Sequence, residues 1–232
     1  MEEIMNITKN RSEMIKKMAV IGVFTALAYV CVCVFRIKVS FLTLDIKDAV
    51  ITSAAMMISP IAGVIISLIV ALIEMLTISE TMLYGFIMNF LSSATFSVVA
   101  SLIYRQKRNL FFAVLGLITA VFSVTAVMML ANLFVTPYYM GVDRSTVSAL
   151  IPKLLLPFNL TKAVLNSAIV MIIYKPISSA LRRARLLKRR DDSSLGYRID
   201  KRTAIVTLVS VAVLILCLVI FFVVLKAKID LF

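Results

Sequence analysis

Three nitrogen-bearing side chains lie near the ends of two long apolar segments. Asn159 and Lys162 are three residues apart, so a helix places them on one face. Asn132 lies near the end of the preceding apolar segment. Amide and ammonium groups donate hydrogen bonds, and no nucleophile or general base accompanies them. This set favours binding of a neutral ligand rich in hydrogen-bond acceptors. The neighbouring aromatic side chains available for stacking are Phe134, Tyr138, Tyr139 and Phe158.

Catalytic and metal-binding chemistry has little support in the sequence. Histidine, the commonest metal ligand and general base, is absent. Cys31, Cys33 and Cys217 all lie in apolar runs, which is typical of packing residues. The six glycines are isolated, and no G-x-x-x-x-G-K-[ST] phosphate-binding loop occurs. We therefore expect no enzyme activity, no metal site and no resident cofactor, and any ATP-driven step must come from partner subunits.

The composition predicts a membrane protein. Hydrophobic residues make up 62% of the 232 residues, whereas soluble domains contain about 45–50%. The net charge of +13 is concentrated between apolar runs rather than spread over one face, which argues against nucleic-acid binding. The fold class predicted is all-α, a polytopic helical bundle surrounded by the lipid bilayer.

Apolar runs of about 20 residues are long enough to span a bilayer. One further run, residues 49–75, contains Ser59-Pro60 and is either one kinked helix or two short helices. The clear spans are residues 18–35, 82–104, 110–134, 154–174 and 204–225.

The positions of basic residues decide between these two alternatives. Most of the 25 Lys and Arg residues lie in three clusters, at 9–17, 105–108 and 175–202. Two helices within 49–75 place all three clusters on the cytoplasmic side, as the positive-inside rule requires. The first of these helices is then only about 17 Å long and must be shielded by its neighbours.

The resulting organisation is that of a multi-pass protein of the cell membrane with four parts and a cytoplasmic N-terminus. The external loops are predicted at 36–47, 77–81 and 136–153. The parts are a cytoplasmic segment (1–17), a six-helix core (18–180), a basic cytoplasmic linker (181–202) and an additional transmembrane helix with a short external tail (203–232).

Charged residues near the predicted outer face are candidates for a site, and each also has a structural interpretation. Asp45 and Asp48 are suited to capping the next helix, where free N–H groups attract a carboxylate. Glu74 either pairs with Lys162 or reaches the headgroups. Lys162 lies in an apolar helix, where an ionisable group indicates function unless its ammonium extends to the interface.

Three motifs carry a resemblance to a known family. Residues 41–48 read FLTLDIKD and precede the Ser59-Pro60 break, 132–141 read NLFVTPYYMG, and 156–162 read LPFNLTK. Over about residues 14–180 the chain resembles the substrate-binding S components of energy-coupling factor (ECF) transporters, in the riboflavin-binding branch. It departs from the pattern at Ser59, where the family usually has Gly, at 49–50, where a Pro is often found, and in its seventh helix.

The resemblance implies a ligand, partners and roles for particular residues. It implies that riboflavin is bound from outside and delivered inward, with a coupling membrane protein and two ATP-binding cassette ATPases as partners. Asn132, Asn159 and Lys162 match positions that hydrogen-bond the flavin ring, and Leu42 and Leu44 match positions that cover it. A small-residue face at Gly22 and Ala26 matches the contact with the coupling protein.

Other interpretations remain open at this stage. The chain could be an S component for another vitamin, or an autonomous secondary transporter, although neither repeats nor coupling-ion groups are evident. An intramembrane enzyme has only the solitary Glu74 as a clear intramembrane carboxylate. Gly22 and Ala26 could instead let helices approach closely within the bundle itself.

Overall fold

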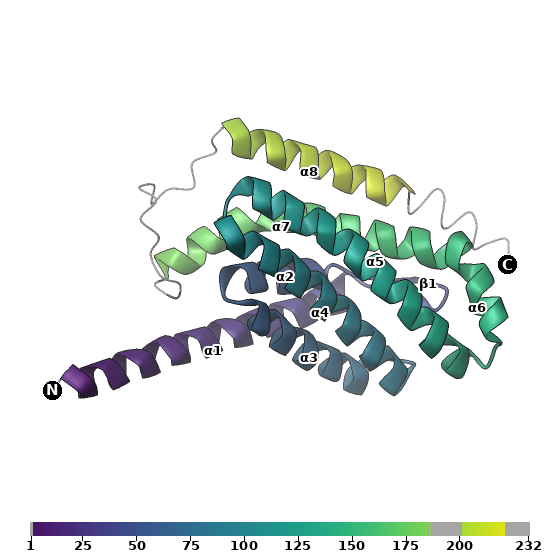
Figure 1. Cartoon of the computed structure of the whole chain (residues 1–232), viewed down its shortest axis with the longest axis horizontal. Coiled ribbons are helices and arrows are strands. Elements are labelled where there is room, and N and C mark those ends of the chain that lie inside the picture. The colour runs from purple at the N-terminus through teal and green to yellow at the C-terminus, as the bar shows by residue number, and fades with distance from the viewer. Residues whose placement is uncertain (1, 185, 187–200, 221–232) are drawn as a thin grey trace.

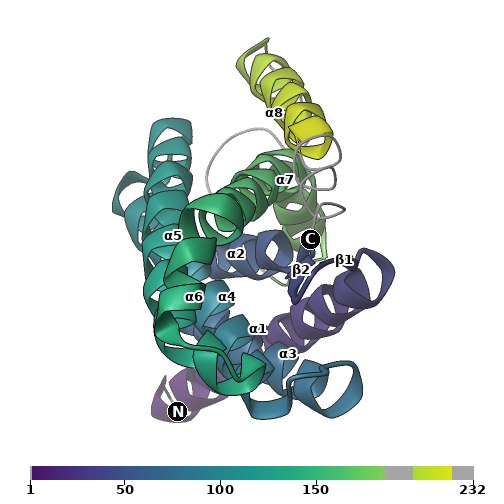
Figure 2. The same cartoon turned by 90° about the vertical axis from the view of Figure 1, so that its right-hand side faces the viewer.

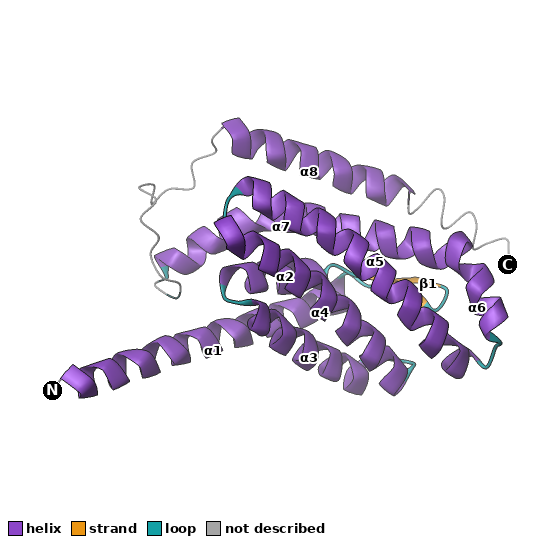
Figure 3. Ribbon diagram, viewed as in Figure 1, coloured by secondary structure: helices purple, strands orange, loops and turns teal. Residues whose placement is uncertain are grey.

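The computed structural model is a bundle of long helices and describes residues 2–184, 186 and 201–220 (Figure 1; Figure 3). The prediction of an all-α membrane bundle is confirmed, since five helical stretches are long and apolar enough to cross a membrane. The elements are α1 (Glu2–Val34), β1 (Ile37–Val39), β2 (Leu42–Leu44), α2 (Lys47–Met57), α3 (Pro60–Thr77), α4 (Met82–Lys107), α5 (Leu110–Met140), α6 (Arg144–Leu150), a π-helical turn (Ile151–Leu155), α7 (Leu156–Arg183) and α8 (Lys201–Ile220).

The run at 49–75 forms two helices rather than one kinked helix. Ser59 is extended, with φ −170°, and its side chain accepts a hydrogen bond from the Ala62 N–H at 3.1 Å. Pro60 occupies the first turn of α3, where its missing N–H costs nothing. The cap and the proline therefore start a new helix directly after α2 ends.

Helix α2 is short and enclosed by protein. Its 11 residues span about 17 Å, and residues 47–56 are all buried. It packs against α1, α3, α4 and α7. The shielding that the sequence required of this segment is therefore present, because no part of its polar backbone needs to face lipid.

The two ends of the bundle differ in charge. The N-terminus of α1, the α4–α5 connection and the end of α7 lie at one end, and the hairpin β1–β2 and α6 lie at the other (Figure 1). The described parts of the three basic clusters thus share one end, as two crossings within 49–75 require. Residues 2–17, expected as a separate segment, continue α1 as helix.

Two segments expected as loops contain regular structure. Within 36–47, β1 and β2 form an antiparallel hairpin that pairs Ile37 with Leu44 and Val39 with Leu42. The prediction of a loop at 136–153 was wrong over most of this segment. Helix α5 continues through Pro137 to Met140, and α6 follows. The hairpin was not predicted because strands of three residues are too short to show an alternation of apolar and polar side chains.

Helix α8 lies along the outside of the bundle beside α7 (Figure 1; Figure 2). Its apolar stretch, Ala204–Cys217, overlaps the additional helix predicted at 203–225. Most of the predicted linker and the predicted external tail lie outside the described residues.

The close contact of α2, α3 and α4 at Gly63 gives a test of the packing. A Cβ at Gly63 would lie 2.8 Å from the Ala55 Cβ and 2.9 Å from the Ser97 Oγ. We expect Gly63→Ala to lower stability by about 1–3 kcal/mol through overpacking, measured by thermal unfolding in detergent. Gly22→Ala is the control, because nothing lies within 4 Å of a Cβ there. Equal unfolding temperatures for the two variants would contradict the close packing.

Candidate ligand-binding site

A polar cavity lies between the hairpin and the adjoining ends of α3, α4, α5 and α7. Its floor contains buried charges, and its outer rim contains aromatic and exposed charged side chains. The lining residues used below are Arg36, Lys38, Phe41, Leu42, Thr43, Asp45, Glu74, Ile78, Glu80, Tyr84, Met88, Asn89, Asn132, Tyr139, Phe158, Asn159 and Lys162.

The structure brings together the three nitrogen-bearing side chains that the sequence indicated. Asn132, Asn159 and Lys162 all line this cavity, and all three are buried. The Asn132 amide donates to the Met128 carbonyl at 2.7 Å, and the Asn159 amide donates to the Leu155 carbonyl at 2.8 Å. Each amide group has two N–H donors, and these hydrogen bonds use one of them.

Lys162 forms a buried ion pair with Asp45. Its ammonium lies 2.8 Å from Asp45 Oδ2 and 3.3 Å from the Thr43 carbonyl. Asn166 links the two segments of backbone by donating to the carbonyls of Asp45 and Lys162, each at 3.0 Å. Lys162 therefore points into the protein and does not extend to the interface. The pair joins the hairpin to α7.

Asp45 and Asp48 form contacts across the bundle and are not simple helix caps. The N-cap position of α2 is Ile46, which makes no side-chain cap bond, and Asp45 reaches the Lys47 N–H only at 3.3 Å. The Asp48 carboxylate accepts from the Ser93 hydroxyl on α4. Burial raises the pKa of Asp45, but the charges of Lys162 and Lys47 outweigh it and hold this pKa below its ordinary value.

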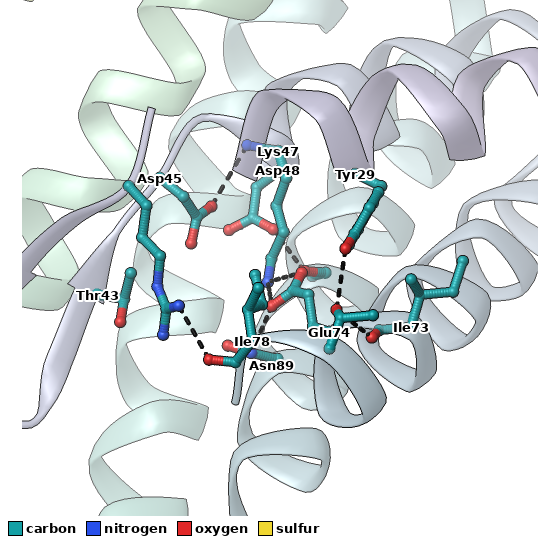
Figure 4. Close-up of polar contacts among 12 residues, drawn as sticks. Tyr29, Thr43, Asp45, Lys47, Asp48, Ile73, Glu74, Ile78 and Asn89 are labelled. Atoms are coloured by element: carbon teal, nitrogen blue, oxygen red, sulfur yellow. Dashed lines mark hydrogen bonds and ion pairs between the residues drawn. The ribbon is translucent and has the colours of Figure 1, made fainter. Parts of the chain in front are cut away.

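A second buried ion pair crosses the cavity floor (Figure 4). The Lys47 ammonium, at the start of α2, donates to both oxygens of Glu74, at 2.6 and 2.8 Å. Asn89 on α4 donates to Glu74 Oε2 at 2.7 Å. Glu74 thus pairs with Lys47, and both alternatives drawn from the sequence, Lys162 and the headgroups, are wrong. We call Asp45, Lys47, Glu74 and Lys162 the buried charge network.

Contacts at the outer rim close the hairpin against the α3–α4 connection. Lys38 forms an ion pair with Glu80, and Arg36 donates to the Ile78 carbonyl at 2.9 Å. The hydrogen bond from Lys38 lowers the pKa of Glu80. Phe41, at the hairpin turn, lies edge-on to Tyr139 with ring centroids 6.1 Å apart. These side chains form the mouth of the cavity.

The predicted apolar and aromatic residues divide into two groups. Leu42, Tyr139 and Phe158 line the cavity. Leu44 lies deeper, in a small core cluster with Val39 and Phe158, and is not part of the lining. Phe134 and Tyr138 are exposed on the outside of α5, at 53% and 68%. The aromatic side chains that line the cavity are Phe41, Tyr84, Tyr139 and Phe158.

Sequence reasoning missed two of the polar contributors. Lys47 was not singled out, because it follows the hairpin directly and resembles a loop charge. Asn89 was also missed, although an amide within the apolar run 82–104 is a signal that could have found it. Among the described residues, no group of three His, Cys, Asp or Glu side chains is placed to hold a metal ion. The arrangement of amide, ammonium and carboxylate groups is suited to hydrogen bonding.

The Lys47–Glu74 pair gives a test of what supports the cavity floor. Lys47 is 1% exposed and Glu74 is 4% exposed, so Lys47→Met leaves a buried carboxylate without its cation. We expect a loss of about 3–5 kcal/mol in stability, measured by thermal unfolding in detergent. Lys47→Met combined with Glu74→Gln should recover much of the loss.

The exposed pair at the mouth provides the matched control. Lys38→Gln with Glu80→Gln should leave the unfolding temperature nearly unchanged, because water screens exposed pairs. If Lys47→Met unfolds no earlier than this control, the buried pair does not hold the floor together.

Comparison with known proteins agrees with this geometry. Residues 16–174 match the family model for the ECF transporter, substrate-specific component. The chain is 29% identical to the riboflavin transporter RibU of Staphylococcus aureus (strain TCH60) over 177 residues, which cover 72% of this chain and 93% of that protein. It also matches the solved structure of the S component of a bacterial ECF transporter, with a TM-score of 0.63, 29% identity, and coverage of 73% of this chain and 99% of that chain. The chain belongs to the substrate-specific components of ECF transporters.

Proposed function

We propose that this S component binds riboflavin in the cavity and delivers it inward, with ATP hydrolysis carried out by partner subunits. The observation that carries the proposal is the convergence of Asn132, Asn159 and Lys162 on one cavity. The similarity to a riboflavin transporter over most of both chains supports the choice of vitamin. The sequence contains no G-x-x-x-x-G-K-[ST] phosphate-binding loop, so the proposal assigns ATP hydrolysis to partner subunits.

The remaining hydrogen-bond donors suit a flavin ring. The Lys162 ammonium has three N–H donors, and two of them form the hydrogen bonds to Asp45 and to the Thr43 carbonyl. With one further N–H from each of Asn132 and Asn159, the proposal assigns three donors to the ligand. The isoalloxazine ring is flat and carries carbonyl oxygens and ring nitrogens as acceptors. It can satisfy these donors while Phe158 and Tyr84 contact its faces.

The charge balance of the cavity favours a neutral ligand. Lys162 is paired with Asp45, and Lys47 is paired with Glu74, so each cation of the buried charge network already has a carboxylate partner. A neutral vitamin leaves both pairs unchanged. An anionic ligand would bring an unpaired charge into a site that has little water to solvate it.

The ligand assignment is tested by titrating purified protein with riboflavin and following the quenching of its fluorescence. We expect saturable quenching, because the ring loses contact with water between aromatic and amide groups. Biotin, thiamine and folate serve as competitors and should not displace riboflavin. Saturable binding of one of these vitamins, with none of riboflavin, would reject riboflavin and keep the family.

Substitutions at the three donors test the proposed binding mode. Lys162→Ala should weaken binding about 10- to 150-fold, because a charged hydrogen bond is worth about 1.5–3 kcal/mol. Asn132→Ala and Asn159→Ala should each cost about 0.5–1.5 kcal/mol. Dissociation constants from the fluorescence titration provide the measurement. Parent-like affinity in all three variants would place the ligand elsewhere.

The ion pair separates the role of Lys162 in binding from its role in folding. Lys162→Ala alone also leaves Asp45 buried without a partner, so its unfolding temperature should fall. Adding Asp45→Asn should restore the unfolding temperature but not the affinity. Recovery of both would mean that Lys162 acts only through the fold.

We also propose that the coupling membrane protein contacts α1 at Gly22 and Ala26. Both residues are exposed on the bundle, and a Cβ at Gly22 would meet nothing within 4 Å, which supports a docking face over internal packing. Small residues let a second helix approach closely. The exposed Val23 and Leu27 flank them on the same helix.

Bulky substitutions test this contact. Gly22→Trp and Ala26→Trp should abolish riboflavin uptake in cells that contain the partner subunits, yet leave binding by the purified protein nearly intact. Leu130→Trp is the control, because it adds bulk at an exposed position on a different helix, α5. Normal uptake by the first two variants, or uptake lost equally in all three, would argue against this surface.

A further inference from the structure

A second groove lies between α5, α7 and α8, on the outside of the bundle. It consists of two hollows that share Met171; α5, α7 and α8 line both, and Met56 of α2 and Tyr104 of α4 also line one of them. It uses none of the residues that line the cavity described above. Its wall includes α8, which lies beyond the residues that match the family.

The hollow nearer the basic end of the bundle contains two cationic side chains among its lining residues. Arg108, at the end of α4, and Lys175, on α7, both line it. Tyr104 and Tyr174 line it as well, and their hydroxyls are hydrogen-bonded at 2.8 Å. The Asn109 side-chain oxygen caps α5 by accepting from the Phe112 N–H at 2.9 Å, so its amide N–H groups remain as donors. Cations, hydroxyls and an amide are the groups that bind phosphate.

The adjoining hollow is almost entirely apolar. Leu117 and Val121 line it from α5, Val164 from α7, and Val209 and Val213 from α8. Of its polar residues, Ser167 donates its hydroxyl to the Ala163 carbonyl at 2.9 Å. A hydrocarbon chain fits such a surface, because it requires no hydrogen bonds and is already the solvent of a membrane helix.

The two hollows together match one kind of molecule. An anionic head at one end and a long apolar chain at the other are the parts of an anionic phospholipid. Two cations at the polar end favour a net negative headgroup, whereas the ammonium of a zwitterionic lipid is repelled there. Basic pockets between membrane helices are known to hold such headgroups.

We propose that this groove binds an anionic phospholipid, with its phosphate at Arg108 and Lys175 and one acyl chain between α5, α7 and α8. In this arrangement α8 supplies one wall of a lipid site. The lipid fills the space between the family core and the additional helix. The site is independent of the riboflavin cavity, which lies toward the opposite end of the bundle.

Native mass spectrometry of the delipidated full chain, titrated with defined lipids, tests this proposal. Dioleoylphosphatidylglycerol should bind about tenfold or more tightly than dioleoylphosphatidylcholine, because each basic residue near a headgroup adds to the attraction. Arg108→Gln with Lys175→Gln should remove this preference. Thermal unfolding and riboflavin titration of the same variant show that it is folded.

A matched variant and a short-chain lipid make the test specific. Arg105→Gln with Lys107→Gln removes two charges from the end of α4 at positions that do not line the groove, and it should keep the preference. Dihexanoylphosphatidylglycerol should bind more weakly than the dioleoyl lipid, because it cannot fill the apolar hollow. Equal binding of the two dioleoyl lipids, equal loss in both variants, or equal binding of the short-chain lipid would each overturn the proposal.

Discussion

The structure depends on two ion pairs taken out of water, Lys47–Glu74 and Asp45–Lys162. Removing charges from water costs several kcal/mol for each ion, so such groups are stable only when they are paired and hydrogen-bonded. Asn89 donates a hydrogen bond to the Glu74 carboxylate. Asn166 donates to the backbone carbonyls of both Asp45 and Lys162 and so links these two segments. The hairpin, the short helix α2 and the helices α3, α4 and α7 therefore meet where these two pairs form.

The same constraint explains why a short helix can exist in this bundle. Helix α2 cannot cross a bilayer by itself, yet both ends of it are fixed. Lys47 anchors its start to α3, and Ser59 with Pro60 turns the chain immediately after its end. Its backbone is surrounded by four other helices. The ligand cavity opens beside this fixed segment, so its polar lining is held in place before a ligand arrives.

Much of the architecture could be predicted from the sequence, because the strongest signals are local. Apolar length located the spans, the distribution of Lys and Arg required a break within 49–75, and Ser59-Pro60 marked where it falls. Asn132, Asn159 and Lys162 were identified because polar groups at membrane depth are costly. Strands of three residues carry no such signal, which is why the hairpin was missed.

The partners of the buried charges could not be predicted for a different reason. Lys47 and Glu74 are 27 residues apart, and Asp45 and Lys162 are 117 apart. Several pairings of these four residues balance the charge equally well. Only the rotation and depth of each helix choose among them. Similarly, Leu42 and Leu44 share one face of β2, and the position of Phe158 decides which of the two lies deeper.

The contrast between the mouth and the floor of the cavity has a consequence for how the protein responds to its surroundings. Lys38 and Glu80 meet where water and dissolved ions reach them, and both weaken an exposed ion pair. Lys47 and Glu74 lie beneath, out of reach of those ions. The salt concentration of the surrounding medium therefore acts on the contact between the hairpin and the α3–α4 connection, while the arrangement of groups at the base of the cavity stays the same in dilute and concentrated media.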